Sequence, residues 1–498
     1  MSIKAALSKP YARFMVQRRK AWTSRPLKTQ EKWMHYLLKK AAGTAFGKDH
    51  SLESITDYAS WKSSIPIREY EGLLPYVERV LKGEDDVLWP GRPQYLAKTS
   101  GTTAGAKYIP ITRQSMPFHI RSAKMALLSY IDETGNADFV DGKMIFLQGS
   151  PALEEKNGLS IGRLSGITAH HVPAYLQTNR LPSLKTNLIE DWESKVDAIV
   201  EETVGQDLRL ISGISSWVQM YFEKLLAFTG KKSVIEVFPN FQLFVYGGVN
   251  FAPYQQRFKE LIGKEIPSIE LFPASEGFFA YQDSQKEKGL LLECNSGMFY
   301  EFIPVEEFHD ESPTRVWLKD VELDRNYVLI INSVAGLWGY NIGDTVRFVS
   351  KDPYRLVVSG RLKHFTSAFG EHVIAEEVES AMEEVMEATA CSVTEFHLAP
   401  QVTPTEGLPY HEWFIEFSTE PQSMVAFAKQ LDEALIRRNP YYKDLIHGHV
   451  LRPLVIRPMK EGGFKAMMSE RGKLGGQNKV PRLANDRTVA DILMRFLA

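Results

Sequence analysis

The stretch from Lys98 to Thr112, KTSGTTAGAKYIPIT, combines residue types that bind phosphate groups. It holds hydroxyl donors, flexible glycines and a cation, namely Ser100, Thr102, Thr103, Gly101, Gly105 and Lys107. The glycines let backbone N–H groups approach phosphate oxygens, and the lysine adds a point charge. The stretch departs from the P-loop pattern G-x-x-x-x-G-K-[ST], because three residues separate its glycines and no Ser or Thr follows the lysine. It therefore predicts a polyphosphate cradle, with an ordinary Ser-, Thr- and Gly-rich surface loop as the alternative.

Two apolar runs farther along the chain end in small and polar residues. The first predicts a strand over Phe241 to Tyr246, followed by a turn at Gly247 and Gly248 and then a helix to Ile262. In open α/β sheets, ligands gather at the carboxyl ends of such strands. We therefore expect Gly248 to lie at a ligand site.

The second run predicts a strand over Ser268 to Phe272 that leads into Ala274, Ser275 and Glu276. This order places Glu276 at a strand end, where its hard carboxylate oxygens could hold a magnesium ion. The alternative is an acid at a helix N-terminus that interacts with the helix dipole.

Three other candidate site residues stand in later segments. In GLWGYNIGDTVRF, Tyr340 precedes Asp344 by four residues, and Gly343 allows a tight turn; an ordinary turn is the alternative. Arg361 follows Gly360 at the end of an alternating run. Lys479 stands in a glycine-rich tail that we expect to be an exposed, mobile loop.

Aromatic and apolar side chains could form a substrate pocket. Ser215 or Ser216 is predicted to cap a helix that carries an apolar face. The candidates for the pocket are Trp217, Met220, Tyr221, Phe251 and Phe278. The alternative is packing in the core, where most aromatic residues lie.

The elements that must position these residues indicate an α/β protein of two domains. Residues 1–359 are predicted to form a large N-terminal domain of β-sheets flanked by helices. Residues 360–364 are predicted to form a hinge, because the residue pattern changes at the helix that begins at Ala375. Residues 365–498 are predicted to form a smaller, mobile C-terminal α/β domain.

Composition narrows the class of protein. The chain has 498 residues, of which 44% are hydrophobic and 24% charged, as in ordinary globular proteins. A net charge of −2 gives no reason to expect nucleic acid as a partner, and no run of apolar residues is long enough to span a membrane. Cys294 and Cys391 lack a C-x-x-C spacing, which argues against zinc and disulfides and favours the cytoplasm. The first thirty residues are basic and without acid, which favours a partly helical N-terminal arm over a transit segment.

The ordered set TSGTTAGAK, ASEG, YNIGD and SGR resembles the adenylate-forming superfamily over nearly the whole chain. Within that superfamily, the chain is similar to the Gretchen-Hagen-three family of acyl-acid amido synthetases. The early IPxxxYExLxPYxxRxxxG stretch, Ile65 to Gly83, and the tail from Gly463 to Arg482 carry this likeness.

The resemblance implies that ATP and a carboxylic acid form an acyl-adenylate, whose acyl group an amine then takes, typically from an amino acid. It implies that Ser100, Gly101, Thr102, Thr103 and Lys107 hold phosphates, and that Gly248, Ala274, Ser275 and Tyr340 lie near the nucleotide. It further implies that Glu276 lies by the α-phosphate and Mg²⁺, that Asp344 and Arg361 lie at the ribose, and that Lys479 reaches in from the small domain for catalysis.

Two features of the chain limit how far the family resemblance extends. The loop lacks the Glu-Arg pair that plant members carry before the lysine, and the chain is shorter than theirs, so the resemblance does not extend to plant-hormone substrates. An acyl-CoA ligase, an enzyme that stops at the adenylate, and a nucleotide-binding protein without turnover are the alternatives. We expect a monomer that acts on small molecules, with neither nucleic acid nor membrane as a partner.

Overall fold

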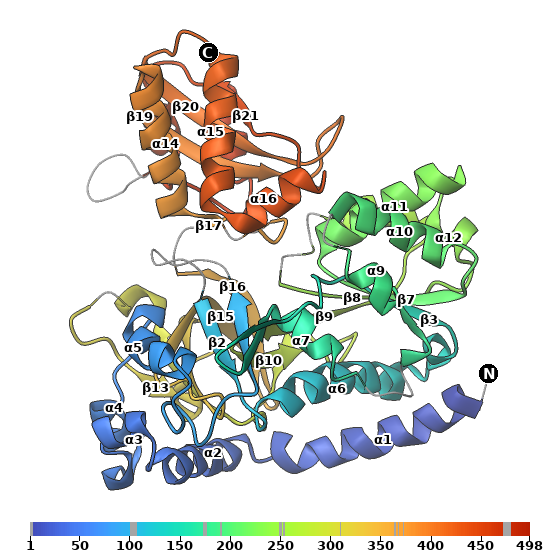
Figure 1. The fold of residues 1–498 in the computed structure, drawn as a ribbon, viewed down its shortest axis with the longest axis vertical. Helices are drawn as coiled ribbons and strands as arrows, with labels where there is room; N and C mark the ends of the chain where they lie inside the picture. The colour runs from blue at the N-terminus through green and yellow to red at the C-terminus, as the bar shows by residue number, and fades with distance from the viewer. Residues whose placement is uncertain are drawn as a thin grey trace.

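The computed structural model describes residues 3–99, 107–172, 177–189, 192–248, 251, 254–308, 310–362, 365–366, 368–371, 373–471 and 480–498. In this part of the chain, the largest sheet has twelve strands in the order β13-β12-β14-β15-β16-β11-β10-β9-β8-β7-β3-β6. Figure 1 shows this sheet in the lower part of the molecule, and the C-terminal elements lie above it.

One half of the large sheet is parallel. Its neighbouring strands all run in the same direction: β9 (Ser268–Ala274), β8 (Leu243–Gly247), β7 (Leu208–Ser212), β3 (Lys143–Phe146) and β6 (Arg180–Leu181). Their carboxyl ends therefore meet along one edge, where loops can gather side chains from distant segments.

Successive side chains of these parallel strands point to opposite faces of the sheet, and apolar residues build a core on each face. Ile211 and Phe244 pack with α10 (Trp192–Thr203), α11 (Ser215–Thr229) and α13 (Gln255–Ile262). Leu210 and Val245 pack on the opposite face with α6 (Met116–Thr134) and α1 (Ile3–Thr23). The short helices α9 (Leu184–Asn187) and α12 (Val234–Val237) belong to the same region of the chain. This half is thus a helix–sheet–helix sandwich.

The other half of the large sheet is antiparallel. It contains β10 (Gly277–Tyr281), β11 (Leu290–Leu292), β16 (Tyr354–Arg361), β15 (Tyr340–Lys351), β14 (Asn326–Ser333), β12 (Met298–Pro304) and β13 (Val316–Trp317). The helices α2 (Pro26–Ala41), α3 (Ala45–Asp49), α4 (Tyr58–Ser64) and α5 (Tyr70–Leu81) contribute to its core. Trp61 and Trp338 are fully buried there.

A small sheet carries the predicted phosphate loop. Its strand order is β2-β1-β5-β4, formed by β2 (Lys107–Ile111), β1 (Tyr95–Thr99), β5 (Leu159–Gly162) and β4 (Glu154–Lys156), and α7 (Leu164–Ala169) follows it. Thr99 pairs with Lys107, so this antiparallel pair closes both ends of the loop. The loop itself, residues 100–106, lies outside the described part.

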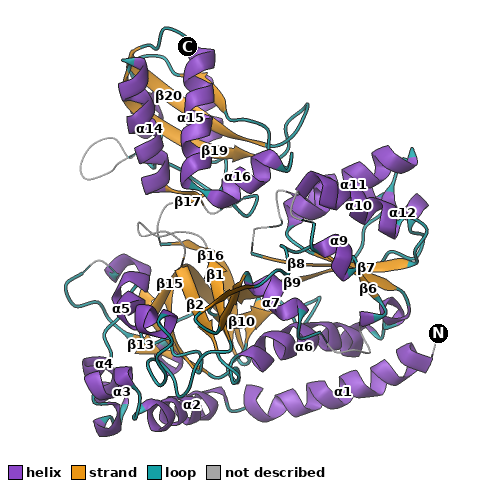
Figure 2. Cartoon of the chain, viewed as in Figure 1, coloured by secondary structure: helices purple, strands orange, loops and turns teal. Residues whose placement is uncertain are grey.

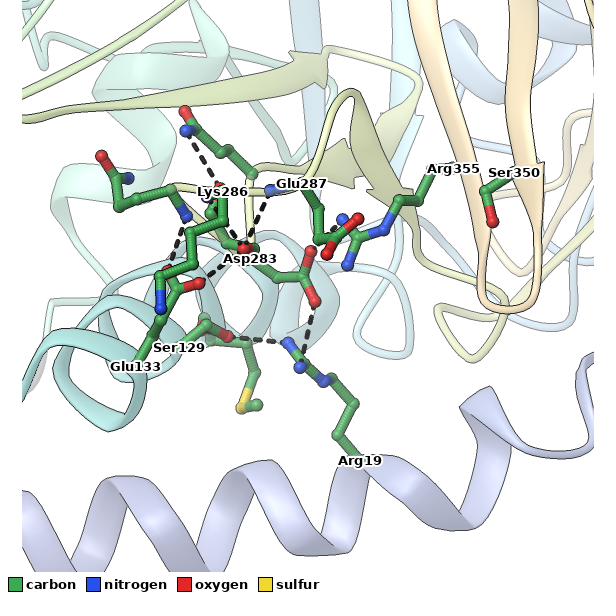
Figure 3. A network of polar contacts seen from close by, with 12 residues as sticks. Arg19, Ser129, Glu133, Asp283, Lys286, Glu287, Ser350 and Arg355 are labelled. Atoms are coloured by element: carbon green, nitrogen blue, oxygen red, sulfur yellow. Dashed lines mark hydrogen bonds and ion pairs between the residues drawn. The ribbon is translucent and has the colours of Figure 1, made fainter.

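Helix α1 is fixed along the lower margin of the molecule (Figure 1). Its Arg19 donates to the Ser129 hydroxyl at 2.7 Å and pairs with the Asp283 carboxylate at 3.0 Å. Arg355 from β16 pairs with the same carboxylate, as Figure 3 shows. The predicted N-terminal arm is therefore a helix docked on the protein.

The C-terminal part is built on the sheet β19-β20-β21, separate from the large sheet (Figure 2). Its elements are β19 (Ser392–Gln401), β20 (Tyr410–Thr419), β21 (Val455–Pro458), α14 (Ala375–Thr389), α15 (Met424–Arg438), α16 (Pro440–His447), α17 (Gly463–Glu470) and α18 (Ala490–Leu493). A two-stranded ladder of β17 (Phe365–Thr366) and β18 (Val373–Ile374) precedes them. The predicted α/β fold class is confirmed.

The predicted cap of α11 is wrong. Ile214 occupies the capping position, and no side chain caps the helix. The Ser215 hydroxyl is buried and has no hydrogen-bond partner among the described residues. The serine pair resembles a cap in sequence, but the helix begins one residue too early for Ser215 to act as one.

Candidate active site

A cleft of about 2330 Å³ lies between the large sheet and the C-terminal part. Its walls include many predicted site residues: Lys107, Gly248, Ala274, Ser275, Glu276, Asp344, Trp217 and Phe278. Val480 and Pro481, next to the predicted Lys479, line it from the C-terminal part. Segments far apart in the sequence therefore share one cavity.

Several predicted residues lie outside what the structure describes. These are Ser100, Gly101, Thr102, Thr103 and Lys479. The backbone of Arg361 is described as the last residue of β16, but its side chain is not.

Lys107 is held at the base of the phosphate loop. Its ammonium group lies 5.7 Å from the centre of the Tyr70 ring, and the Tyr70 hydroxyl accepts a hydrogen bond from the Tyr108 N–H at 2.9 Å. Lys98 and Thr99, on the opposite strand, also line the cleft. Both ends of the loop therefore open into the cavity, which suits an anion.

The turn after β8 needs glycine. A side chain at Gly247 would meet the Leu271 carbonyl oxygen at 2.5 Å, and Gly248 has a φ of +83°, which favours glycine. Glu276 occupies the turn between β9, the strand next to β8, and β10, and it lines the same cleft. A flat ring could approach the glycines closely.

Asp344 lies in β15, and only 8% of its surface is exposed. It is directly opposite Arg361 in the β15–β16 ladder. Gly343 has a φ of +86°, which favours glycine. Its carbonyl accepts a hydrogen bond from the Leu362 N–H at 2.8 Å. The strand pair thus holds Asp344 rigidly at the cleft wall.

Tyr340 and three of the predicted pocket residues lie away from the cleft walls. Tyr340 is 1% exposed and belongs to the core of the antiparallel half. Met220 and Tyr221 pack in the core around α11, where the Tyr221 hydroxyl bonds to Thr203 at 2.7 Å. Phe251 stacks in an aromatic cluster, 4.7 Å from the Tyr246 ring. Because both sides of α11 are covered, its apolar face mainly builds the core.

The titratable groups that the structure adds to the cleft walls without any motif to mark them include His119, Arg180 and Glu270. Burial lowers the pKa of His119 to about 4, so this side chain is neutral at pH 7. Burial raises the pKa of Glu270. Both effects follow from the cost of keeping a charge away from water.

Arg180 lies on the edge strand β6, and burial lowers its pKa. Its guanidinium donates to the Ala169 carbonyl at 3.2 Å and lies 5.6 Å from the centre of the Phe146 ring. Within the described part of the chain, no carboxylate pairs with it. A cation held by a carbonyl and a ring suits an anionic or strongly polar ligand group.

Beside the cleft, the C-terminal part contacts the segment between β5 and α7 and the start of α13. Arg163 pairs with Asp444 at 2.7 Å and stacks over the Tyr441 ring at 4.8 Å. The Tyr254 hydroxyl donates to the Ala368 carbonyl just beyond β17. Beside these polar contacts, one cluster of buried apolar residues includes Tyr254 and Phe258 as well as Phe369 and Val373, so the interface also has an apolar part.

Comparison with known proteins adds three family matches. The GH3 family N-terminal domain matches residues 16–183, the GH3 family central domain matches residues 291–361, and the GH3 family C-terminal domain matches residues 376–488.

Individual relatives are distant in sequence. The chain is 22% identical to the jasmonoyl–L-amino acid synthetase JAR4 of Nicotiana attenuata, over 64% of this chain and 66% of the relative. It is 21% identical to the indole-3-acetic acid-amido synthetase GH3.3 of Arabidopsis thaliana, over 93% of this chain and 90% of the relative. The solved GH3.15 acyl acid amido synthetase superposes with a TM-score of 0.61 at 15% identity, covering 97% of this chain and 96% of that one. The matches to GH3.3 and GH3.15 cover both the large sheet and the C-terminal part.

Proposed function

The chain belongs to the GH3 family, and from this premise we propose that it is an ATP-dependent acyl acid amido synthetase. It joins a small carboxylic acid to an amine, most simply that of an amino acid, and releases AMP and pyrophosphate. The plant hormones in the names of its relatives are substrates of those proteins.

The observation that carries the proposal is the composition of the cleft wall. Lys107 comes from the hairpin, Glu276 from the turn after β9, and Asp344 from β15. A cation and two carboxylates around a glycine turn match the needs of a nucleotide with a reacting phosphate.

In the first step, a carboxylate oxygen of the acid attacks the α-phosphorus of ATP. The bond to the bridging oxygen of pyrophosphate breaks, and the acid becomes an acyl-adenylate. Negative charge grows on the α-phosphate oxygens, so fixed cations lower the barrier. We assign this role to Lys107, the 100–103 hydroxyl and backbone groups, and Lys479, and we assign the ribose hydroxyls to Asp344 and Arg361.

A magnesium ion fits the donor set, because Mg²⁺ prefers carboxylate and phosphate oxygens and Glu276 offers a carboxylate at the cleft wall. Glu276 would hold the ion, which neutralises phosphate charge when bound. Ala274, Ser275 and Gly248 would border the nucleotide beside it.

In the second step, the amine nitrogen attacks the acyl carbonyl. The carbon–oxygen bond to AMP breaks, the amide forms, and the ammonium group loses its protons to solvent or to a nearby base. We propose that residues 365–498 rotate relative to residues 1–359 about a hinge at 360–364 between the two steps. Because β16 extends to Arg361, this hinge begins at the last residues of a strand.

The acid is proposed to lie between α6 and the sheet. Phe278 and neutral His119 line the cleft on this side, whereas Trp217 lines it from α11 on the opposite face of the sheet. We also propose that the protein is a monomer and that it works in the cytoplasm, where its two buried cysteines, Cys294 and Cys391, stay reduced. Among the described residues, no helix has the length and apolar character needed to cross a bilayer.

Pyrophosphate release with a library of carboxylic acids tests the first step, and mass spectrometry of products with mixed amino acids tests the second. The proposal expects acid-dependent pyrophosphate release and an amide. A thioester formed with coenzyme A in place of the amide would favour the acyl-CoA ligase. No turnover across a broad library would favour a nucleotide-binding protein.

A further inference from the structure

Helix α1 has two apolar faces, and only one of them is covered. Ala5, Ala12 and Val16 are buried, and the helix packs on α6. Their spacings of seven and four residues place them on one side of an α-helix.

The opposite side of α1 exposes large apolar side chains. Ile3 is 80% exposed, Leu7 is 64% exposed and Phe14 is 55% exposed. These residues are also spaced by four and seven positions. Phe14 follows Ala5 by nine residues, which is two and a half turns at 3.6 residues per turn, so this stripe points away from the protein. We call Ile3, Leu7 and Phe14 the outer stripe.

Basic side chains surround the outer stripe. Lys4 and Arg18 are exposed beside it, and the Arg18 guanidinium lies 5.6 Å from the centre of the Phe14 ring. Residues 1–48 contain twelve lysine and arginine residues and one acid, Glu31, although the whole chain has a net charge of −2. The positive charge is thus concentrated on the two helices α1 and α2.

Helix α2 extends the same charged margin. Figure 1 shows α1 and α2 following one another along the lower edge of the molecule. Lys28, Lys32 and Lys39 on α2 are exposed. The margin therefore presents an apolar stripe on α1 beside lysines and arginines of both helices.

We propose that this margin is a docking surface for an anionic lipid membrane. An interfacial helix buries apolar side chains among lipid headgroups and places lysine and arginine near the phosphates. Helix α1 has 21 residues and is roughly 30 Å long, so it can lie along a bilayer surface. The protein is then peripheral, which revises the expectation of no membrane partner.

Two features of the margin favour a membrane over other occupants. A second copy would bring two strongly basic surfaces together, which costs energy through like-charge repulsion. Nucleic acid would satisfy the cations but leave the outer stripe without an apolar partner. A membrane with anionic headgroups satisfies both kinds of side chain.

Docking along α1 leaves the active site accessible. The C-terminal part lies at the far end of the molecule from α1 (Figure 1), and among the described residues none of α1 lines the cleft. The surface is therefore separate from the proposed chemistry, and its test does not depend on that chemistry.

The test is flotation of the full-length protein with vesicles of phosphatidylcholine, with and without phosphatidylglycerol. We expect binding to the anionic vesicles, little binding to phosphatidylcholine alone, and a decrease as salt is raised. Leu7→Glu with Phe14→Glu should reduce the bound fraction about tenfold or more, because both charges would enter the bilayer. Lys4→Glu with Arg18→Glu should abolish the preference for anionic lipid.

The matched control is Val425→Glu, because Val425 is 82% exposed on α15 and lies outside the margin. It should bind like the unaltered protein, and thermal unfolding should be unchanged in all variants. Absence of binding to anionic vesicles at low salt would overturn the proposal, as would full binding by the Leu7→Glu/Phe14→Glu variant. A dimer in light scattering that this variant converts to a monomer would assign the stripe to a second copy. Binding to an oligonucleotide but not to vesicles would assign the margin to nucleic acid.

Discussion

Charged groups beneath the large sheet and charged groups in the cleft are held in different ways. Beneath the sheet, Asp283 receives Arg19 at 3.0 Å and also Arg355, and the three side chains are 5%, 13% and 8% exposed (Figure 3). In the cleft, Arg180 meets a carbonyl and an aromatic ring, and burial raises the pKa of Glu270. Each charged group beneath the sheet therefore has a partner of opposite charge within the protein.

This difference in partners distinguishes the charged groups that hold the structure together from those that can bind a ligand. A buried ion pair with complete partners fixes α1 and β16 in place and offers nothing to a ligand. A desolvated group without an opposite charge raises the energy of the empty protein, and a ligand can recover that energy. The following changes test this division, beginning with the largest expected effect.

Removal of Asp283 should have the largest effect. Asp283→Ala leaves two buried guanidinium groups without their carboxylate, so the free energy of unfolding should fall by about 3–5 kcal/mol. Unfolding in denaturant measures this loss in the free energy of unfolding. The control is Asp85→Ala, which breaks the exposed Arg92–Asp85 pair and should cost less than about 1 kcal/mol. Equal losses in the two variants would contradict the structural role.

Lys479→Ala should slow adenylation with no comparable loss of stability. Removing one group that stabilises transition-state charge costs about 10²- to 10³-fold in rate. Acid-dependent pyrophosphate release measures the loss. Lys429→Ala, on the exposed face of α15, is the control and should retain full activity. Unchanged pyrophosphate release by the Lys479 variant would end its assignment.

His119 should make the protein sensitive to acid. Burial lowers its pKa from 6.5 to about 4, so the unfolded chain gains a proton first as the pH falls. Stability is full above pH 6.5 and decreases toward pH 4, by on the order of 3 kcal/mol if the whole shift applies. His119→Leu should flatten this part of the pH–stability curve, whereas His35→Gln, at an exposed site, should not. The same slope in His119→Leu would show that other groups cause the acid sensitivity.

Arg180 should affect binding more than chemistry. Four strand spacings separate β6 from β9, or about 19 Å, so Arg180 lies far from Glu276. We expect Arg180→Leu to raise KM for the acid or the amine about tenfold with little change in kcat, because a charged hydrogen bond contributes roughly 1.5–3 kcal/mol. Steady-state kinetics with each substrate varied in turn identifies which one is affected. Arg209→Leu, at a site away from the cleft walls, is the control, and a fall in kcat alone would contradict the binding role.

Local patterns in the sequence were sufficient to predict many elements of the fold. The strand predicted over Ser268 to Phe272 begins at the same residue as β9 (Ser268–Ala274). The family was predicted from the order of its motifs, and the family matches confirm it.

Contacts between distant segments could not be predicted in this way. Arg19, Asp283 and Arg355 meet only because α1, the turn after β10 and β16 converge in space. His119, Arg180 and Glu270 line the cleft from a helix and two strands without any motif of their own. Periodicity identifies a buried face but not the element that covers it, so Met220 and Tyr221 could not be told apart from pocket residues.

The measurement that tests the central claim most directly follows the oxygen atoms of the acid. An acid found by the pyrophosphate screen is prepared with a heavy oxygen isotope in its carboxylate and is incubated with ATP and mixed amino acids. The account predicts one heavy oxygen in AMP and one in the amide carbonyl, because the carboxylate attacks the α-phosphorus. Heavy oxygen in inorganic phosphate together with ADP, or AMP without label, would contradict it.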